Sequence, residues 1–131
     1  MTTTLNSTPK NTINWFEIPV RDMAKATALY NALLDLKLEV TDFGGMAHAV
    51  FPHGNATVSG ALVVDPKRSP GGTGPLIYLN ATDGVARCLA RGVEAGAKVI
   101  QPATPIGPHG TIAIIEDLDG NVVGLHEEAA R

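Results

Sequence analysis

The sequence is poor in cysteine and has no long apolar run. Its 131 residues include one cysteine, Cys88, which cannot form an intrachain disulfide. The fold must therefore be held by a hydrophobic core, and low cysteine use is typical of a cytoplasmic protein. No stretch approaches the roughly 20 apolar residues that a membrane-spanning helix needs. We expect a cytoplasmic protein that has no membrane partner.

An excess of positive charge is also missing. Lysine and arginine together number 10 against 13 acidic residues, which gives a formal net charge of −3. Binding to nucleic acid or to an anionic lipid surface needs a basic footprint, so neither partner is expected. Hydrophobic residues make up 44% of the chain, enough for one domain with a core of its own. We expect a single domain over residues 1–131.

Two catalytic motifs are absent as well. No serine stands in a G-x-S-x-G sequence, so serine hydrolysis has no support. The GGTG at 71–74 is not followed by Gly-Lys-[Ser/Thr] or by the start of a helix, so it does not predict a phosphate loop.

What is present is one pattern written twice. In each half a predicted strand leads into a helix, and three further short strands follow. We place module one at about 12–65, a linker rich in proline and glycine at 66–74, and module two at about 75–127. Asp22 is the predicted cap of the first helix and Asp83 that of the second.

The repetition is visible in the residues themselves. Pro-His-Gly occurs at 52–54 and again at 108–110, and the segments 54–62 and 120–126 align with Gly60 opposite Gly124. Each unit would have one sheet face covered by its helix and one face bare. The predicted fold class is α+β: two βαβββ modules form mixed, curved sheets around a cavity, with the helices on the outer face.

This arrangement resembles the vicinal oxygen chelate superfamily, which contains glyoxalase I, the bleomycin-resistance proteins and the extradiol dioxygenases. The resemblance rests on the repeat, on Ile-Pro-Val-Arg-Asp-Met at 18–23 before an alanine-rich helix, on Gly-Ala-Lys-Val at 96–99, and on Glu-Asp-Leu-Asp-Gly-Asn at 116–121. It covers residues 12 to 127. The superfamily contains lyases, isomerases, epimerases, dioxygenases and drug-binding proteins, so the resemblance implies a fold and leaves the reaction open.

Enzymes of this superfamily hold a metal ion with ligands on the first and last strand of each half. Counting from the helix caps and the Gly-Asn turns, the resemblance places Trp15, Gly60, Ile77 and Gly124 at these four positions. None of these side chains binds a metal. The resemblance therefore implies a metal-free pocket without a cofactor, with an aromatic wall and room beside the glycines, in a protein that forms a homodimer.

Glu17 is the candidate catalytic residue. It lies two residues from Trp15 and hence on the same face of a strand. Burial would raise the pKa of its carboxyl and suit it to act as a general base or as a ligand anchor, unless an arginine or a backbone group pairs with it. His126 shares a face with Gly124. The predicted ligand-binding residues are Trp15, Glu17, Gly60, Ile77, Gly124 and His126.

The main alternative is a relocated metal site. Glu17, His48 and His126 would supply two histidines and a carboxylate for a divalent metal, as in a glyoxalase-like lyase or a dioxygenase. A second alternative is an accessory domain without pocket chemistry. Cys88, on the apolar stripe of the second helix, is expected to be a core residue, and Tyr78 to pack under that helix. His53 and His109 are expected to lie in exposed turns.

The favoured hypothesis is a protein resembling the glyoxalases and bleomycin-resistance proteins that binds a small apolar or aromatic molecule. The sequence leaves open whether that molecule is only held or is turned over with Glu17 as the base.

Overall fold

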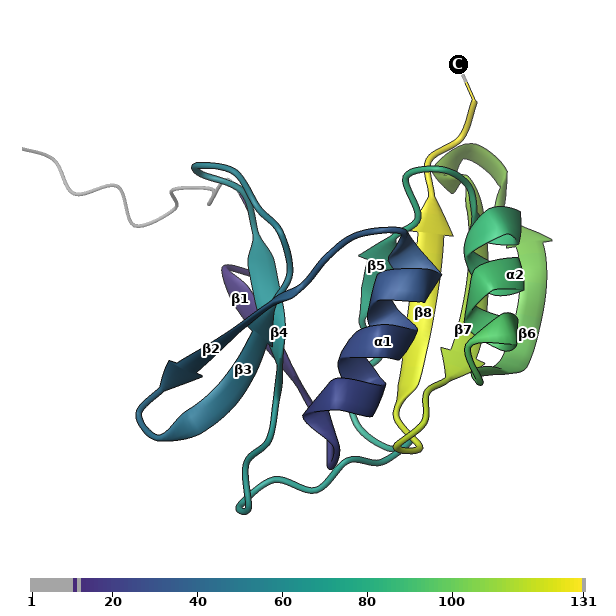
Figure 1. The fold of residues 1–131 in the computed structure, drawn as a ribbon. Coiled ribbons are helices and arrows are strands. Elements are labelled where there is room, and N and C mark those ends of the chain that lie inside the picture. Colours follow the sequence, from purple (N-terminus) through teal and green to yellow (C-terminus); the bar gives the residue numbers. More distant parts are fainter. Residues whose placement is uncertain (1–10, 12, 131) are drawn as a thin grey trace, which may run out of the picture.

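The structure, a computed structural model, describes residues 11 and 13–130, and the predicted element order occurs in it twice (Figure 1). The first module contains β1 (Trp15–Pro19), α1 (Met23–Leu34), β2 (Glu39–Phe43), β3 (Met46–Val50) and β4 (Ser59–Val63). The second contains β5 (Tyr78–Asn80), α2 (Val85–Glu94), β6 (Lys98–Pro105), the short 3₁₀ helix η1 (Gly107–His109), β7 (Thr111–Glu116) and β8 (Val122–Glu127).

Each module forms one mixed sheet of four strands. The strand orders are β1-β4-β3-β2 and β5-β8-β7-β6, and these sheets are named sheet A and sheet B. The first and last strands of each module pair in parallel, and the other pairs are antiparallel. The predicted α+β fold with two βαβββ modules is confirmed, and β1 and β5 are edge strands.

The two helices begin in different ways. The Asp22 side chain accepts a hydrogen bond from the Lys25 N–H at 3.0 Å, as the sequence predicts. Asp83 does not cap α2, which begins after Gly84 without a side-chain cap of its own. The Val85 N–H instead donates to the Glu127 carboxylate, 2.8 Å away at the end of β8. The prediction for Asp83 is wrong because the cap comes from a distant strand.

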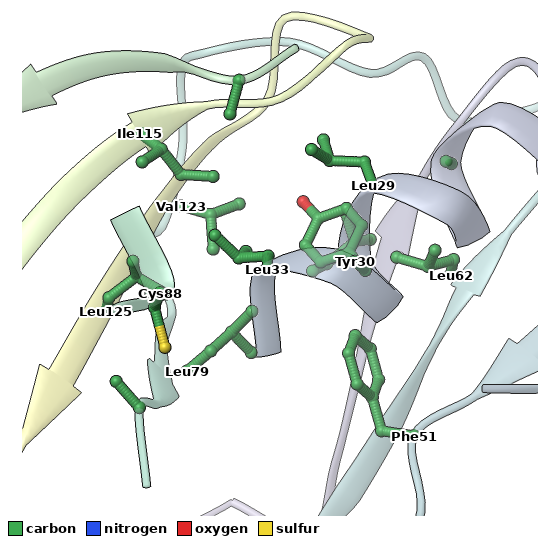
Figure 2. Close-up of a cluster of buried hydrophobic side chains, with 14 of the residues drawn as sticks. Leu29, Tyr30, Leu33, Phe51, Leu62, Leu79, Cys88, Ile115, Val123 and Leu125 are labelled. Atoms are coloured by element: carbon green, nitrogen blue, oxygen red, sulfur yellow. The ribbon is translucent and has the colours of Figure 1, made fainter. Parts of the chain in front are cut away.

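The two helices pack against each other between the sheets (Figure 1). The Arg91 guanidinium on α2 donates to the Ala32 carbonyl at 2.7 Å and to the Leu33 carbonyl at 3.1 Å, and so satisfies carbonyls at the end of α1. A single core extends from sheet A to sheet B. Its side chains in Figure 2 come from both modules and include Tyr30, Leu33, Leu62, Cys88 and Leu125.

Each sheet therefore has a helix face and an outer face, and no helix of the described residues covers the outer face. The helices, expected on the outer face, instead pack against each other in the core that the two sheets share. The outer faces carry half-exposed aromatic side chains: Trp15 is 44% exposed, Phe43 51% and Tyr78 44%. Tyr78 is thus not packed under α2, contrary to expectation, whereas Cys88 is fully buried as predicted.

The turn before β8 joins the two modules. Asp117 is buried and accepts hydrogen bonds from the Tyr30 hydroxyl at 2.8 Å and from the Asn121 side chain at 3.0 Å. The Asn121 amide also donates to the Pro19 carbonyl at the end of β1, at 2.8 Å. The Asp-Leu-Asp-Gly-Asn sequence therefore has a structural role here. In the described residues, no helix is long and apolar enough to cross a membrane.

Candidate functional site

Strand register decides which predicted site residues share a face. In sheet A, Phe16 lies opposite Gly60 and Glu17 opposite Ala61. In sheet B, Tyr78 lies opposite Gly124. Phe16 packs toward the core with Phe51, which places Gly60 on the helix face, whereas Gly124 shares the outer face with Tyr78. The predicted alignment of the two glycines is wrong by one residue, which is enough to change the face.

Aromatic rings fill the space beside both glycines. A methyl group added at Gly124 would overlap the Tyr78 ring, and one added at Gly60 would overlap both the Phe16 ring and the Phe16 carbonyl. The expectation of open ligand space beside them is therefore wrong. Each glycine lets an aromatic side chain of the neighbouring parallel strand lie flat across it.

Four side chains meet on the outer face of sheet A and are named the Glu17 cluster: Trp15, Glu17, His48 and Arg68. The Arg68 guanidinium donates to Glu17 Oε1 at 2.6 Å, and the Trp15 indole N–H donates to Oε2 at 3.2 Å. His48 Nε2 lies 3.6 Å from the same Oε2. Three elements supply the cluster, namely β1, β3 and the linker after β4.

The charge of Glu17 is stabilised by its partners. The hydrogen bond from Arg68 holds the pKa of the Glu17 carboxyl below its usual value, and the bond from Trp15 acts in the same direction, against the opposite effect of partial burial. The pKa is not raised, because Glu17 is paired with an arginine, which is the exception stated in the prediction. A weakly basic carboxylate with both oxygens engaged is better suited to anchor a ligand than to remove a proton.

His48 is oriented by the backbone. Its Nδ1 lies 3.0 Å from the Met46 carbonyl, which can only accept a hydrogen bond, so Nδ1 carries the hydrogen and Nε2 is directed at Glu17. The Phe43 ring packs edge to face on the imidazole, with 5.1 Å between the ring centroids. His48 is buried and completes the wall of the Glu17 cluster.

His126 lies apart from Glu17 and His48. It is on β8 of sheet B, and its Nε2 lies 2.6 Å from the His109 carbonyl. The described ranges contain no group of three or more histidine, cysteine or acidic side chains placed to hold a metal ion. Within one chain the alternative ligands do not assemble, and the geometry does not fit a metal at these three residues.

A pocket of about 450 Å³ lies beside the Glu17 cluster, lined by the end of β1 and the start of β8. The linker segment from Ser69 to Pro75 borders it, together with Asn121, and Glu17 and Ile77 from the predicted site line it. Trp15, Gly60, Gly124 and His126 are not among its lining residues. Ile77 also packs against the core.

Arg68 and Asn121 were not among the predicted site residues. Arg68 lies in the proline- and glycine-rich linker, and its Nε also donates to Asp65 Oδ2 at 3.0 Å. The spacing of Asp65 and Arg68, three residues apart, was the available signal. Asn121 accepts a hydrogen bond from the Gly71 N–H at 2.9 Å and so ties the linker to the turn before β8.

Comparison with known proteins matches this fold to a family. Residues 12–125 match the model of the glyoxalase/bleomycin resistance protein/dioxygenase superfamily. No protein of curated function matches the chain significantly.

Solved structures of members of this superfamily have a similar fold. TnmS3, an antibiotic-binding protein from Streptomyces sp. CB03234, is 28% identical; the match covers 94% of this chain and 100% of TnmS3, with a TM-score of 0.68. A glyoxalase/bleomycin resistance protein from the same strain is 30% identical over 86% of this chain and 97% of its own, with a TM-score of 0.62. A superfamily member from Sphaerobacter thermophilus DSM 20745, 23% identical over 90% of this chain and 98% of its own, shares the fold with a TM-score of 0.65. The chain described here belongs to the glyoxalase/bleomycin resistance protein/dioxygenase superfamily.

Proposed function

We propose that this protein binds a small, partly aromatic molecule at the outer face of sheet A, beside the Glu17 cluster and its pocket, without a metal ion of its own. The observation that carries the proposal is the aromatic character of this face, which no other element of the described residues covers. Of the six aromatic residues in the chain, Trp15 and Phe43 are exposed on the outer face of sheet A, and Tyr78 is exposed on that of sheet B. Exposed aromatic groups on a sheet are typical of a contact surface.

One relative supports a small-molecule ligand. TnmS3 is an antibiotic-binding protein, and the match spans nearly the whole of both chains. The neighbouring pocket of about 450 Å³ is within the size range of small-molecule sites in proteins. Glu17 is the anchoring group in this proposal, with Trp15 as the stacking surface.

The outer faces also favour a homodimer. In one chain the aromatic side chains of sheet A and sheet B lie on faces that point away from a shared core. Gly124 and His126 belong to β8 of sheet B, whereas Trp15 and Glu17 belong to β1 of sheet A. A second copy that set its sheet B against sheet A of the first would cover both surfaces and complete a binding site from two chains. The predicted ligand-lining roles of Gly124 and His126 depend on that assembly.

Thermal unfolding in the presence of a panel of aromatic compounds tests the proposal. A compound that binds only the folded state, present at a free concentration of about 100 times its dissociation constant, stabilises that state by about 2.7 kcal/mol. The melting temperature rises accordingly. We expect the shift to vanish in Trp15→Ala and to persist in Val93→Ala, a matched change of an exposed apolar residue on α2. Equal shifts in the two variants, or no shift with any compound, would contradict the proposal. Light scattering of the unliganded protein measures whether it is a dimer.

A further inference from the structure

We propose that the Glu17 cluster selects ligands that carry a positive charge beside their aromatic ring; this inference rests on the proposed function and specifies its ligand class. The chemistry is that of a protonated amine, which competes with Arg68 for the Glu17 carboxylate.

The first argument is the charge of the cluster and its surroundings. Glu17 and Asp65 contribute two negative charges, and Arg68, which bonds both of them, contributes one positive charge. Two carboxylates therefore share one guanidinium, and Glu17 Oε2 accepts its bond from the neutral Trp15 N–H. A ligand ammonium group can donate a charge-assisted hydrogen bond to that oxygen, whereas a ligand carboxylate has no hydrogen to donate.

The second argument is the position of Arg68. Its side chain is 45% exposed and comes from the linker, so it is in contact with solvent. The Asp65 pair is local, three residues away in the sequence, and does not depend on Glu17. Arg68 can release Glu17 and keep a carboxylate partner, which lowers the cost of exchanging it for a ligand ammonium group.

The third argument is the indole next to the carboxylate. The Trp15 N–H donates to Glu17 Oε2, so the rim of the ring touches the acceptor while 44% of the residue stays exposed. A planar ligand stacked on this indole has its own rim close to Glu17. A charged amine on the rim of the ligand ring can reach the Glu17 carboxylate. An uncharged ligand with the same ring gains only the stacking contact with Trp15.

The experiment uses three probes with one ring system: 2-naphthylmethylammonium, 2-naphthylmethanol and 2-naphthylacetate, titrated calorimetrically at pH 7 and low salt. We expect the ammonium compound to bind about threefold to tenfold more tightly than the alcohol, the range for one partly exposed charge pair. The acetate should bind most weakly. Added salt should reduce the preference for the cation and leave the alcohol unaffected.

Two variants locate the effect. Glu17→Gln should abolish the preference for the ammonium compound over the alcohol. Arg68→Ala should lower the dissociation constant of the ammonium compound about threefold or more, since the guanidinium that competes for Glu17 is gone. Lys67→Ala is the matched control, because it removes a positive charge one residue away whose side chain has no contact with Glu17 among the ion pairs of the described residues.

The outcomes separate this inference from the proposed function. If the alcohol binds and the ammonium compound binds no better, the charge selection is refuted and aromatic binding stands. If the acetate binds best and loses affinity in Arg68→Ala, the site selects anions through Arg68, and the inference is overturned. If no naphthyl probe binds, both the inference and the proposed function are contradicted. An equal gain in affinity for the ammonium compound in Arg68→Ala and Lys67→Ala would also overturn the inference. The gain would then come from the change in net charge and not from the release of Glu17 by Arg68.

Discussion

Gly60 and Gly124 each lie against an aromatic ring, but the two rings have different surroundings. Gly124 meets the ring of Tyr78, a side chain that is half exposed on the outer face. Gly60 meets the Phe16 ring and also the Phe16 carbonyl, on the face that leads to the core. A side chain at the surface can rotate away from an added methyl group, whereas a paired backbone cannot.

The two alanine substitutions should therefore differ in cost. Gly60→Ala is expected to lower the free energy of unfolding by about 2–3 kcal/mol, the upper end of the usual range for overpacking. Gly124→Ala is expected to lower it by about 1 kcal/mol, the lower end of that range. Urea denaturation measures both. The Tyr78→Ala background should remove most of the cost at Gly124 and none of that at Gly60. An equal loss at the two glycines would show that the rings do not set the cost.

At the scale of the elements, α1 and α2 are fastened by a clamp made of Asp83 and Arg91. The guanidinium bonds both Asp83 oxygens, at 2.7 and 3.0 Å, while it also holds the last carbonyls of α1. These bonds from Arg91 lower the pKa of the Asp83 carboxyl from 3.8 to about 2. The clamp thus joins the start of one helix to the end of the other.

This clamp should be sensitive to acid. A carboxyl with a lowered pKa in the folded state stabilises that state above the unfolded value of 3.8, and the contribution is lost as the pH falls from 3.8 toward 2. We expect wild type to be more stable than Asp83→Asn at pH 6 and the difference to shrink toward pH 2. Chemical denaturation at several pH values, followed by circular dichroism, gives the difference. A difference that stays constant with pH would mean that Asp83 acts without its charge.

The elements and their order could be predicted from the sequence, but the faces of the strands could not. Asp22 and the repeated turns locate helices and strands, since the caps and breakers are local signals. Whether Gly60 lies on the outer face depends on how β4 pairs with β1, and one residue of register reverses the answer. Glu17 and Trp15 were found because residues two apart on one strand share a face in any register. Arg68 was not, since the contact from linker to strand spans 51 residues.

At the scale of the molecule, two modules related by sequence share a single interior. The core side chains of Tyr30 and Leu33 on α1 lie in the same cluster as Ile115, Val123 and Leu125 of sheet B. The hydrogen bonds of Asp117 and Asn121 cross the same boundary. Neither module can bury its helix without the other, so separate folding units are not expected.

The chain should therefore unfold in one cooperative step. Differential scanning calorimetry is expected to give a single transition whose calorimetric and van't Hoff enthalpies agree. Tyr30→Phe, which removes the hydroxyl bonded to Asp117, should lower the free energy of unfolding by about 1 kcal/mol and keep the transition single. Two resolved transitions, in either protein, would mean that the modules melt independently and that the shared core is not the source of cooperativity.

The chain has one tryptophan, and it is the indole that donates to Glu17. Emission excited at the red edge of its absorption thus comes from a single chromophore in the Glu17 cluster. Loss of the bond from the indole N–H, or stacking of another ring on its exposed side, changes the solvent relaxation around that chromophore. The molecule thereby carries an optical reporter of its own binding surface, and occupancy can be followed as a spectral shift in unlabelled protein.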